Sequence, residues 1–259
     1  MRSILLLIII FSNNTIALDV NVTELKNKNP ERVLYIGNSY LYYNDSLHNH
    51  VRRMLEEEYS KEIDTTNYKM VTISGSRLPH HNIEYPLNHK NLGAEKPFEL
   101  VILQGGSGEA NTVDERNDFS LEAKAMIKKI HEAGAEAALY MIHAYVKPHE
   151  NTDPEMIKNI KKMYIDAANQ NSVLVMPVGI AFENAYEKNP DIVLHKEYDG
   201  SHPSLLGTYL AACVVFSSIT HKSPLQIQYD YFGKIAEDDK KFLQQVAKNT
   251  VEDFYKIKL

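Results

Sequence analysis

The sequence predicts a single α/β domain built on a parallel sheet with helices on both faces. Short runs rich in β-branched and large apolar residues recur along the chain, as is typical of strands buried on both faces. Between these runs lie stretches with apolar residues at helical spacing. This alternation predicts parallel strands joined by right-handed crossovers. The 259 residues suffice for one domain with a sizeable core.

Five apolar runs are the expected strands. They read VLYIG, KMVTIS, ELVILQ, AALYMI and SVLVMP, at residues 33–37, 69–74, 99–104, 137–142 and 172–177. The expected helices cover residues 46–59, 119–133, 154–168, 179–186, 205–219 and 237–255. Gly134 suits a position just past a helix end, and Pro154 and Pro203 suit first helical turns. The prediction is a doubly wound sheet of five strands in a three-layer domain, without internal repeats.

The N-terminal residues 1–17 have the layout of a secretory signal peptide. Arg2 precedes an apolar run, and a polar stretch then leads to the small residue Ala17. The apolar run is too short to span a membrane as a stable anchor. The alternative to a signal peptide is that this run forms an N-terminal core strand. We expect residues 18–31 to form an irregular arm and residues 32–259 to form the domain. The expected location is secreted or periplasmic, with no stable membrane anchor.

The composition excludes several classes of function. A formal net charge of -6, with no basic run, argues against nucleic acid as a partner. A single cysteine, Cys213, cannot form an internal disulfide, and we expect it to be a buried thiol. No nucleotide-binding or zinc-binding motif is present, so we expect no metal and no cofactor. The oligomeric state stays open.

Candidate catalytic residues lie where strands end, because ligands bind beyond the carboxyl ends of the strands in such sheets. Ser39 follows the first strand, two residues after Gly37. Asp199 and His202 lie three residues apart, just before the expected helix at 205–219. A serine attacks an ester only with a base to take its proton and a third group to orient that base. Taken separately, these residues are better explained as a turn serine and as capping residues.

The combination resembles the SGNH (GDSL-like) hydrolase superfamily, over residues 33–219. The G-N-S at the first strand and the segment DGSHPS are similar to the two outer blocks of that superfamily, and ELVILQGGS looks like a divergent branch of it. The resemblance implies a flavodoxin-like SGNH hydrolase fold. It also implies that Ser39 is the nucleophile, that Asp199 and His202 complete the triad, and that the backbone N–H groups of Ser39 and Gly75 line an oxyanion hole.

The sequence departs from the family pattern at the third oxyanion donor. The family commonly places an asparagine in a G-x-N-D block, whereas the corresponding stretch here reads LQGGSGE. We assign the side-chain amide of Gln104 as the third donor. Ser107 is the competing donor, and the alternative for Gln104 is that it ties down its loop. The first block also differs, since Asn38 stands where aspartate is common.

These observations predict an exported serine esterase that hydrolyses small acyl esters through an acyl-Ser39 intermediate. O-acetyl groups on carbohydrates are the favoured substrates, whereas acyl chain length and the alcohol portion stay open. One alternative is a non-catalytic extracellular binding protein on the same scaffold. Another is a metal-dependent phosphoesterase that uses histidines on the expected active edge; these are His80, His81, His143 and His149. A substrate-lining or surface role is the competing interpretation of those histidines.

Overall fold

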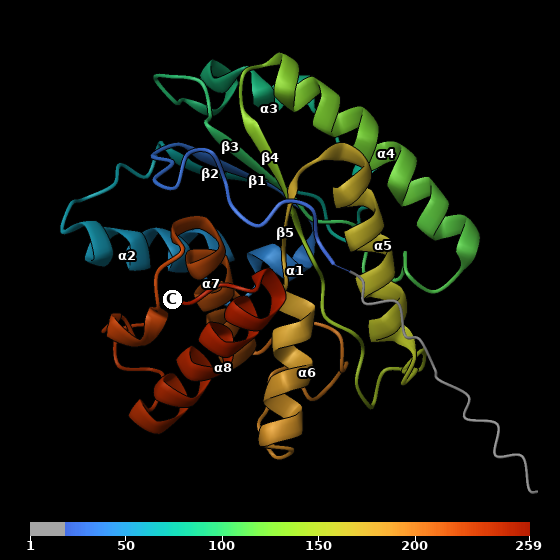
Figure 1. Cartoon of the computed structure of the whole chain (residues 1–259), viewed down its shortest axis with the longest axis vertical. Helices are drawn as coiled ribbons and strands as arrows, with labels where there is room; N and C mark the ends of the chain where they lie inside the picture. The colour runs from blue at the N-terminus through green and yellow to red at the C-terminus, as the bar shows by residue number, and fades with distance from the viewer. Residues whose placement is uncertain (1–18) are drawn as a thin grey trace, which may run out of the picture.

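The computed structural model describes residues 19–259, and the expected signal peptide lies outside them. The predicted sheet of five parallel strands is confirmed, with the strand order β2-β1-β3-β4-β5 (Figure 1). The strands are β1 (Val33–Gly37), β2 (Tyr68–Thr72), β3 (Leu100–Leu103), β4 (Glu136–Tyr140) and β5 (Leu174–Met176). All of β1, β3 and β5 is buried, as their unbroken apolar sequences predict.

Helices cover both faces of this sheet. Figure 1 shows α4 and α5 side by side over one face, while α2, α6, α7 and α8 pack together against the other. The helices are α1 (Ser39–Tyr42), α2 (Leu47–Tyr59), α3 (Glu84–Leu87), α4 (Val113–Glu132), α5 (Met156–Asn171), α6 (Val178–Lys188), α7 (Leu205–Thr220) and α8 (Glu237–Tyr255). The predicted three-layer arrangement is therefore correct.

Several helix boundaries differ from the prediction for local reasons. Helix α4 begins six residues early, because the Thr112 side chain accepts a hydrogen bond from the Glu115 N–H and caps the helix there. Pro154 lies two residues before the start of α5. Pro203 lies outside α7, because Ser204 is the N-cap and its side chain accepts from the Gly207 N–H. The short helices α1 and α3 were not predicted, since four residues show no periodicity.

The most apolar helix, α7, lies in the middle of its layer. Its residues from Gly207 to Thr220 are all buried, and the thiol of Cys213 is among them, as predicted. Burial also raises the pKa of this thiol. Within residues 19–259, no helix is long and apolar enough to cross a membrane.

Candidate active site

Ser39 is the first residue of α1, immediately beyond the carboxyl end of β1. Its neighbour Gly37 permits this tight arrangement, since an added Cβ would lie 2.4 Å from Gln104 Oε1. The Ser39 residue is 6% exposed. The hydroxyl group therefore sits at the rim of the sheet on a rigid base, as the sequence predicts for this position.

The structure brings the three predicted triad residues together. His202 Nε2 lies 2.8 Å from Ser39 Oγ, and His202 Nδ1 lies 2.7 Å from Asp199 Oδ2. The other carboxylate oxygen, Asp199 Oδ1, accepts the N–H groups of Ser201 at 2.8 Å and His202 at 3.0 Å. Both oxygens of the carboxylate are therefore engaged, which holds the carboxylate in one orientation toward the imidazole.

The carboxyl group of Asp199 is stabilised in its charged form. Partial burial by itself would raise its pKa, but the hydrogen bonds from the Ser201 N–H and from His202 outweigh that effect and lower the pKa below its ordinary value. Asp199 is thus an ionised acceptor for the imidazole Nδ1–H. This arrangement leaves Nε2 free to take a proton from Ser39.

The loop between the acid and the base depends on Gly200, which has a positive φ of 64°. A Cβ at this position would lie 2.0 Å from the carbonyl oxygen of Val146. The Val146 N–H in turn donates to the Gly200 carbonyl at 2.9 Å. Only glycine fits both the backbone conformation and the contact, so the glycine of the DGSH sequence fixes the turn that carries Asp199 and His202.

Asn38 connects three loops beside the nucleophile. Its Oδ1 accepts the Tyr40 N–H at 3.1 Å and caps α1. Its Nδ2 donates to the carbonyl oxygens of Ser76, at 2.9 Å, and Gly105, at 3.2 Å. These bonds join the ends of β1, β2 and β3. The amide is nearly fully buried, and both of its ends are used.

Gln104 is buried beneath the loop after β3, and its contacts argue against our assignment of it as an oxyanion donor. The residue is 1% exposed. Its Oε1 accepts the Asn38 N–H at 2.9 Å, and its Nε2 donates to the Gly105 carbonyl. The amide thus ties the loop to the nucleophile segment, which is the alternative role left open by the sequence. The Gln104 side chain occupies the space beside Gly37 that a Cβ at that position would fill.

The two backbone donors predicted for the oxyanion hole are the N–H groups of Ser39 and Gly75, and the carbonyl oxygen of Ser76, next to Gly75, accepts from Asn38 Nδ2 beside the nucleophile. Gly75 lies at the exposed tip of a turn closed by the Ser76 N–H, which donates to the Ile73 carbonyl at 3.1 Å. Across residues 19–259, neither the Ser39 N–H nor the Gly75 N–H has a protein acceptor. Ser107, the competing third donor, lies close to the hydroxyl groups of Tyr40 and Tyr145. Burial raises the pKa of both hydroxyl groups, and the contact with Ser107 opposes this shift without cancelling it.

Glu109 is a buried carboxyl group under the same loop. Its Oε2 accepts the Gly106 N–H at 2.5 Å, and the Arg77 Nε lies 3.9 Å from its Oε1. Burial raises the pKa of Glu109 to about 7, and Glu115 and Asp118 act in the same direction. The hydrogen bond from Gly106 and the charge of Arg77 oppose this shift without cancelling it.

We expect the substitution Glu109→Gln to weaken the pH dependence of stability. Since the pKa of about 7 in the folded protein exceeds the ordinary glutamate pKa of 4.5, the folded state keeps a proton that the unfolded chain loses between these pH values. The carboxyl group of Glu109 contributes its full stabilisation of the folded state below pH 4.5, and this stabilisation is lost as the pH rises to about 7. The free energy of unfolding of the wild type should therefore fall by about 2 to 3 kcal/mol over this range for this reason.

Urea unfolding at about pH 5 and about pH 8 measures this effect. The free energy of unfolding of Glu109→Gln, relative to the wild type, should rise between the two pH values. Glu95→Gln, an exposed position, is the matched control and should show no such rise. An equal difference at both pH values for Glu109→Gln would contradict the assignment.

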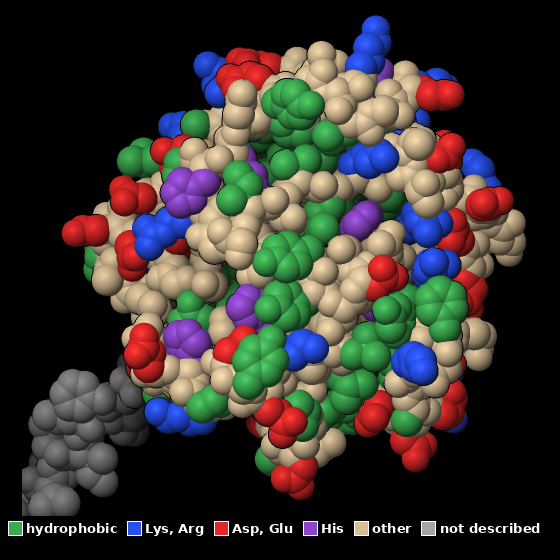
Figure 2. Space-filling view, turned by 180° about the vertical axis from the view of Figure 1, so that it is seen from behind, with side chains coloured by type: hydrophobic (Ala, Val, Ile, Leu, Met, Phe, Trp, Pro, Cys, Tyr) green, Lys and Arg blue, Asp and Glu red, His purple; other side chains and the backbone are tan. Residues whose placement is uncertain are grey.

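Aromatic rings surround the candidate base. Tyr43 stacks on the His202 ring with centroids 4.4 Å apart, and Tyr42 stacks on Tyr43 at 5.6 Å. The hydrogen bond between the hydroxyl groups of Tyr198 and Tyr43 raises the pKa of Tyr43 to about 12. Tyr198 itself is 70% exposed. Figure 2 shows hydrophobic side chains through the middle of one face of the molecule, with histidine side chains at separate places among them.

The histidines considered as metal ligands do not gather into a site. His81 is buried and its Nε2 lies 2.9 Å from Ser76 Oγ, while His143 is buried and its Nε2 lies 2.8 Å from the Ser201 carbonyl oxygen. His80 Nδ1 accepts the Arg77 N–H, and His149 stacks on Tyr145. In the part of the chain that the structure describes, no group of three His, Cys, Asp or Glu side chains is placed to hold a metal ion.

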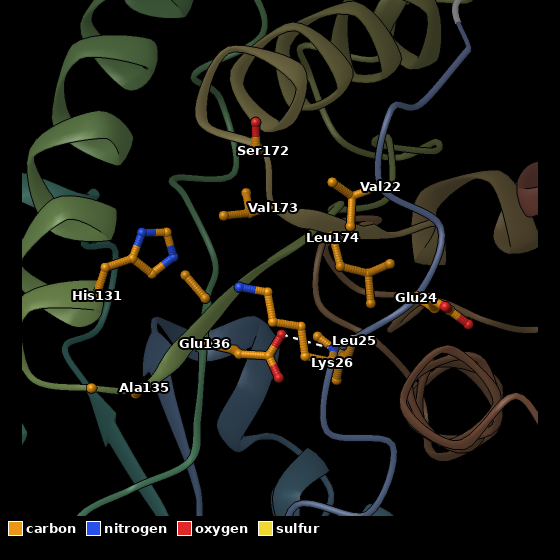
Figure 3. Close-up of a pocket in the computed structure, with 12 residues that line it drawn as sticks. Val22, Glu24, Leu25, Lys26, His131, Ala135, Glu136, Ser172, Val173 and Leu174 are labelled. Atoms are coloured by element: carbon orange, nitrogen blue, oxygen red, sulfur yellow. Dashed lines mark hydrogen bonds between the residues drawn. The ribbon is translucent and has the colours of Figure 1, made fainter.

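A cavity of about 610 Å³ lies away from the triad (Figure 3). The N-terminal arm, the end of α4 and the first residues of β4 and β5 line it. The Lys26 N–H donates to Glu136 Oε2 at 2.9 Å beside this cavity. These linings belong to the amino ends of the strands, so the cavity is at the opposite edge of the sheet from Ser39.

Sequence reasoning missed the residues that support the triad. The buried contacts of Asn38, Ser201 and His143 were not predicted, although all three lie in or beside the quoted motifs. Their positions carried a signal, because polar residues directly after buried strands, or between an acid and a base, need partners when buried. The identity of those partners depends on segments distant in the sequence.

Comparisons with known proteins support the fold. No family model matches the chain, and no curated protein matches its sequence. A DUF4886 family protein from Bacteroides uniformis matches with a TM-score of 0.65 and 20% identity, covering 87% of this chain and 96% of that chain.

Two further solved structures are similar. A suspected SGNH hydrolase from Slackia heliotrinireducens has a TM-score of 0.55 and 21% identity, covering 73% of this chain and 98% of that one. The acetyl xylan esterase AlAXEase has a TM-score of 0.56 and 16% identity, covering 72% and 98%. Together with the strand order, these matches show that this chain has the fold of the SGNH hydrolases.

Proposed function

We propose that this protein is a serine esterase that hydrolyses small acyl esters through an acyl-Ser39 intermediate. The contact between Ser39 Oγ and His202 Nε2 at 2.8 Å, with Asp199 at 2.7 Å on the far side of the imidazole, carries the proposal. A serine, a histidine and an ionised carboxylate in this order are the parts required for nucleophilic acyl transfer.

The chemistry follows from these contacts. His202 Nε2 takes the proton of Ser39 Oγ as the oxygen attacks the ester carbonyl carbon. The tetrahedral intermediate collapses when the imidazolium returns that proton to the leaving alcohol, and the acyl group stays on Ser39. His202 Nε2 then takes a proton from a water molecule, which attacks the acyl carbon, and the imidazolium returns that proton to Ser39 Oγ as the bond to the acyl group breaks and the carboxylic acid leaves. Asp199 keeps Nδ1 protonated and stabilises the imidazolium throughout.

The oxyanion hole we propose uses the backbone N–H groups of Ser39 and Gly75, which are free of acceptors within residues 19–259. Preorganised donors of this kind typically contribute about 3 kcal/mol each to the transition state. Ser107, on the loop after β3, replaces Gln104 as our candidate for the third donor. The Gln104 amide is committed to the Gly105 carbonyl.

We propose O-acetyl groups on carbohydrates as the substrates of a secreted or periplasmic enzyme. Two structural neighbours are acetyl xylan esterases, AlAXEase and the Axe2 protein of Geobacillus stearothermophilus. The tyrosines beside His202 supply flat surfaces that can contact the alcohol portion, which leaves from the side of the base. A non-catalytic binding protein on this scaffold would not need the hydrogen bonds that join Asp199 to His202 and His202 to Ser39.

Labelling with a fluorophosphonate probe tests the esterase proposal. We expect the probe to modify Ser39 in the wild type, as detected by peptide mass spectrometry, because His202 activates that hydroxyl. Acetylated xylan should release acetate in the presence of a chelator. An unlabelled Ser39 would favour the binding-protein alternative, and release that the chelator abolishes would favour a metal-dependent enzyme.

A further inference from the structure

Ser201, which lies between the acid and the base of the candidate triad, has all of its polar groups engaged. Its N–H donates to Asp199 Oδ1 at 2.8 Å. Its carbonyl oxygen lies 2.8 Å from His143 Nε2, and its hydroxyl lies 2.8 Å from the Tyr40 hydroxyl. The residue is 7% exposed. Three separate contacts therefore fix the backbone and side chain of the loop that carries Asp199 and His202.

His143 is a rigid donor for this loop. It is fully buried, and its ring is stacked between Tyr40, at 4.3 Å, and Phe182, at 4.4 Å. Burial lowers the pKa of His143 well below its ordinary value, so the ring is neutral. Its Nδ1 has no partner among residues 19–259. The single ring proton therefore belongs on Nε2, where it donates to the Ser201 carbonyl.

Tyr40 connects the same loop to the nucleophile. It follows Ser39 directly in α1 and is buried. Its ring meets the edge of the His202 ring with centroids 5.9 Å apart, and its hydroxyl contacts Ser201 Oγ. Burial raises the pKa of the Tyr40 hydroxyl, which keeps it protonated as a hydrogen-bonding group. One side chain thus spans from the residue after the nucleophile to the residue before the base.

We propose that Tyr40 and His143 are positioning residues that act through Ser201 to hold His202 in line with Ser39. The proposal rests on the proposed function, because it assigns a purpose to contacts around the same triad. These hydrogen bonds join helix α1, the loop after β4 and the segment before α7 at Ser201. A small displacement of reacting groups can cost about 100-fold in rate, so contacts of this kind matter for turnover.

A double-mutant cycle with Tyr40→Phe and Ser201→Ala tests this proposal. Each substitution removes only one hydroxyl group of the pair. We expect each to lower kcat on a small acetyl ester roughly tenfold, with KM within about twofold of the wild type. The double variant should be no slower than the slower single variant, because the two hydroxyls form one interaction. Losses that multiply, or single variants with wild-type kcat, would overturn the proposal.

Tyr35→Phe is the matched control, since it also removes a buried tyrosine hydroxyl from the segment around β1. The Tyr35 hydroxyl has no hydrogen-bond partner in the described part of the chain. We expect its kcat to equal that of the wild type. For His143, a Gln that retains a donor should keep more activity than a Leu of similar size. Equal activities of His143→Gln and His143→Leu, both folded, would argue against the donor role.

A measurement without turnover separates this proposal from the esterase proposal. The proton on His202 Nδ1, hydrogen-bonded to Asp199, is expected to give a far-downfield NMR resonance in the free protein. Tyr40→Phe and Ser201→Ala should broaden or shift it, whereas Tyr35→Phe should leave it unchanged. A resonance insensitive to Tyr40→Phe and Ser201→Ala would overturn the positioning role even in an active enzyme. A response in a protein without esterase activity would uphold the positioning role and contradict only the proposed function.

Discussion

Replacement of Ser39 or His202 by alanine is expected to lower kcat for ester hydrolysis by about 10⁴-fold or more. Ser39→Ala removes the only atom that can form the acyl intermediate. His202→Ala leaves the serine hydroxyl without the base that now lies 2.8 Å from it. Ser39→Ala removes a single oxygen atom, and the His202 side chain is partly exposed, so neither substitution should lower the melting temperature enough to explain the loss.

The double variant Ser39→Ala/His202→Ala distinguishes a catalytic pair from two independent contributions. Residues of a triad act as one unit, so the double variant should be about as slow as either single variant. Initial rates on a chromogenic acetyl ester, with the melting temperature of each variant, are the measurements. Retention of more than about a tenth of the wild-type kcat in Ser39→Ala would contradict the acyl-Ser39 mechanism.

Asn38→Asp is expected to have the second-largest effect, although aspartate is the residue that the family resemblance would favour at this position. The Asn38 Nδ2 donates to two carbonyl oxygens, those of Ser76 and Gly105. A carboxylate has no proton for either bond and would place a negative charge against both oxygens. We expect a loss of about 3 kcal/mol in the free energy of unfolding.

The same substitution should lower kcat at least tenfold, since Asn38 joins the nucleophile to the turn of Gly75 and to the loop after β3. Urea unfolding and initial rates, both measured well below the melting temperature, test the two effects. Asn117→Asp, an exposed position on α4, makes the same chemical change and should alter neither quantity. A fully stable and active Asn38→Asp would show that the two carbonyl contacts contribute little.

The sequence predicted the five parallel strands and the main helices because their signals are local. Buried strands such as β1 and β3 are continuous apolar runs, and the amphipathic stretches between them have helical periodicity. The start of α4 was wrong by six residues, because the cap at Thr112 outweighed the weaker apolar pattern that follows it. The four-residue helices α1 and α3 are too short for a periodic signal.

The candidate triad was accessible to sequence reasoning because its residues lie in two short motifs placed at predictable ends of elements. A parallel sheet brings the ends of its strands to one edge, so Ser39 and the loop of His202 were expected to meet. Their distances agree with that expectation. The catalytic roles themselves stay predictions that the substitutions above test.

The sequence by itself determined the fold, the position of Ser39 after β1 and the spacing of Asp199 and His202, because each depends on neighbouring residues. Only the tertiary structure decided which polar groups support them. Gln104 turns inward because the Asn38 N–H and the space beside Gly37 receive its amide. Ser201 is held by His143, from the loop after β4, and by Tyr40, from helix α1. The hydrogen-bond partners of these buried side chains lie far from them in the sequence, so local sequence patterns do not predict which donor pairs with which acceptor.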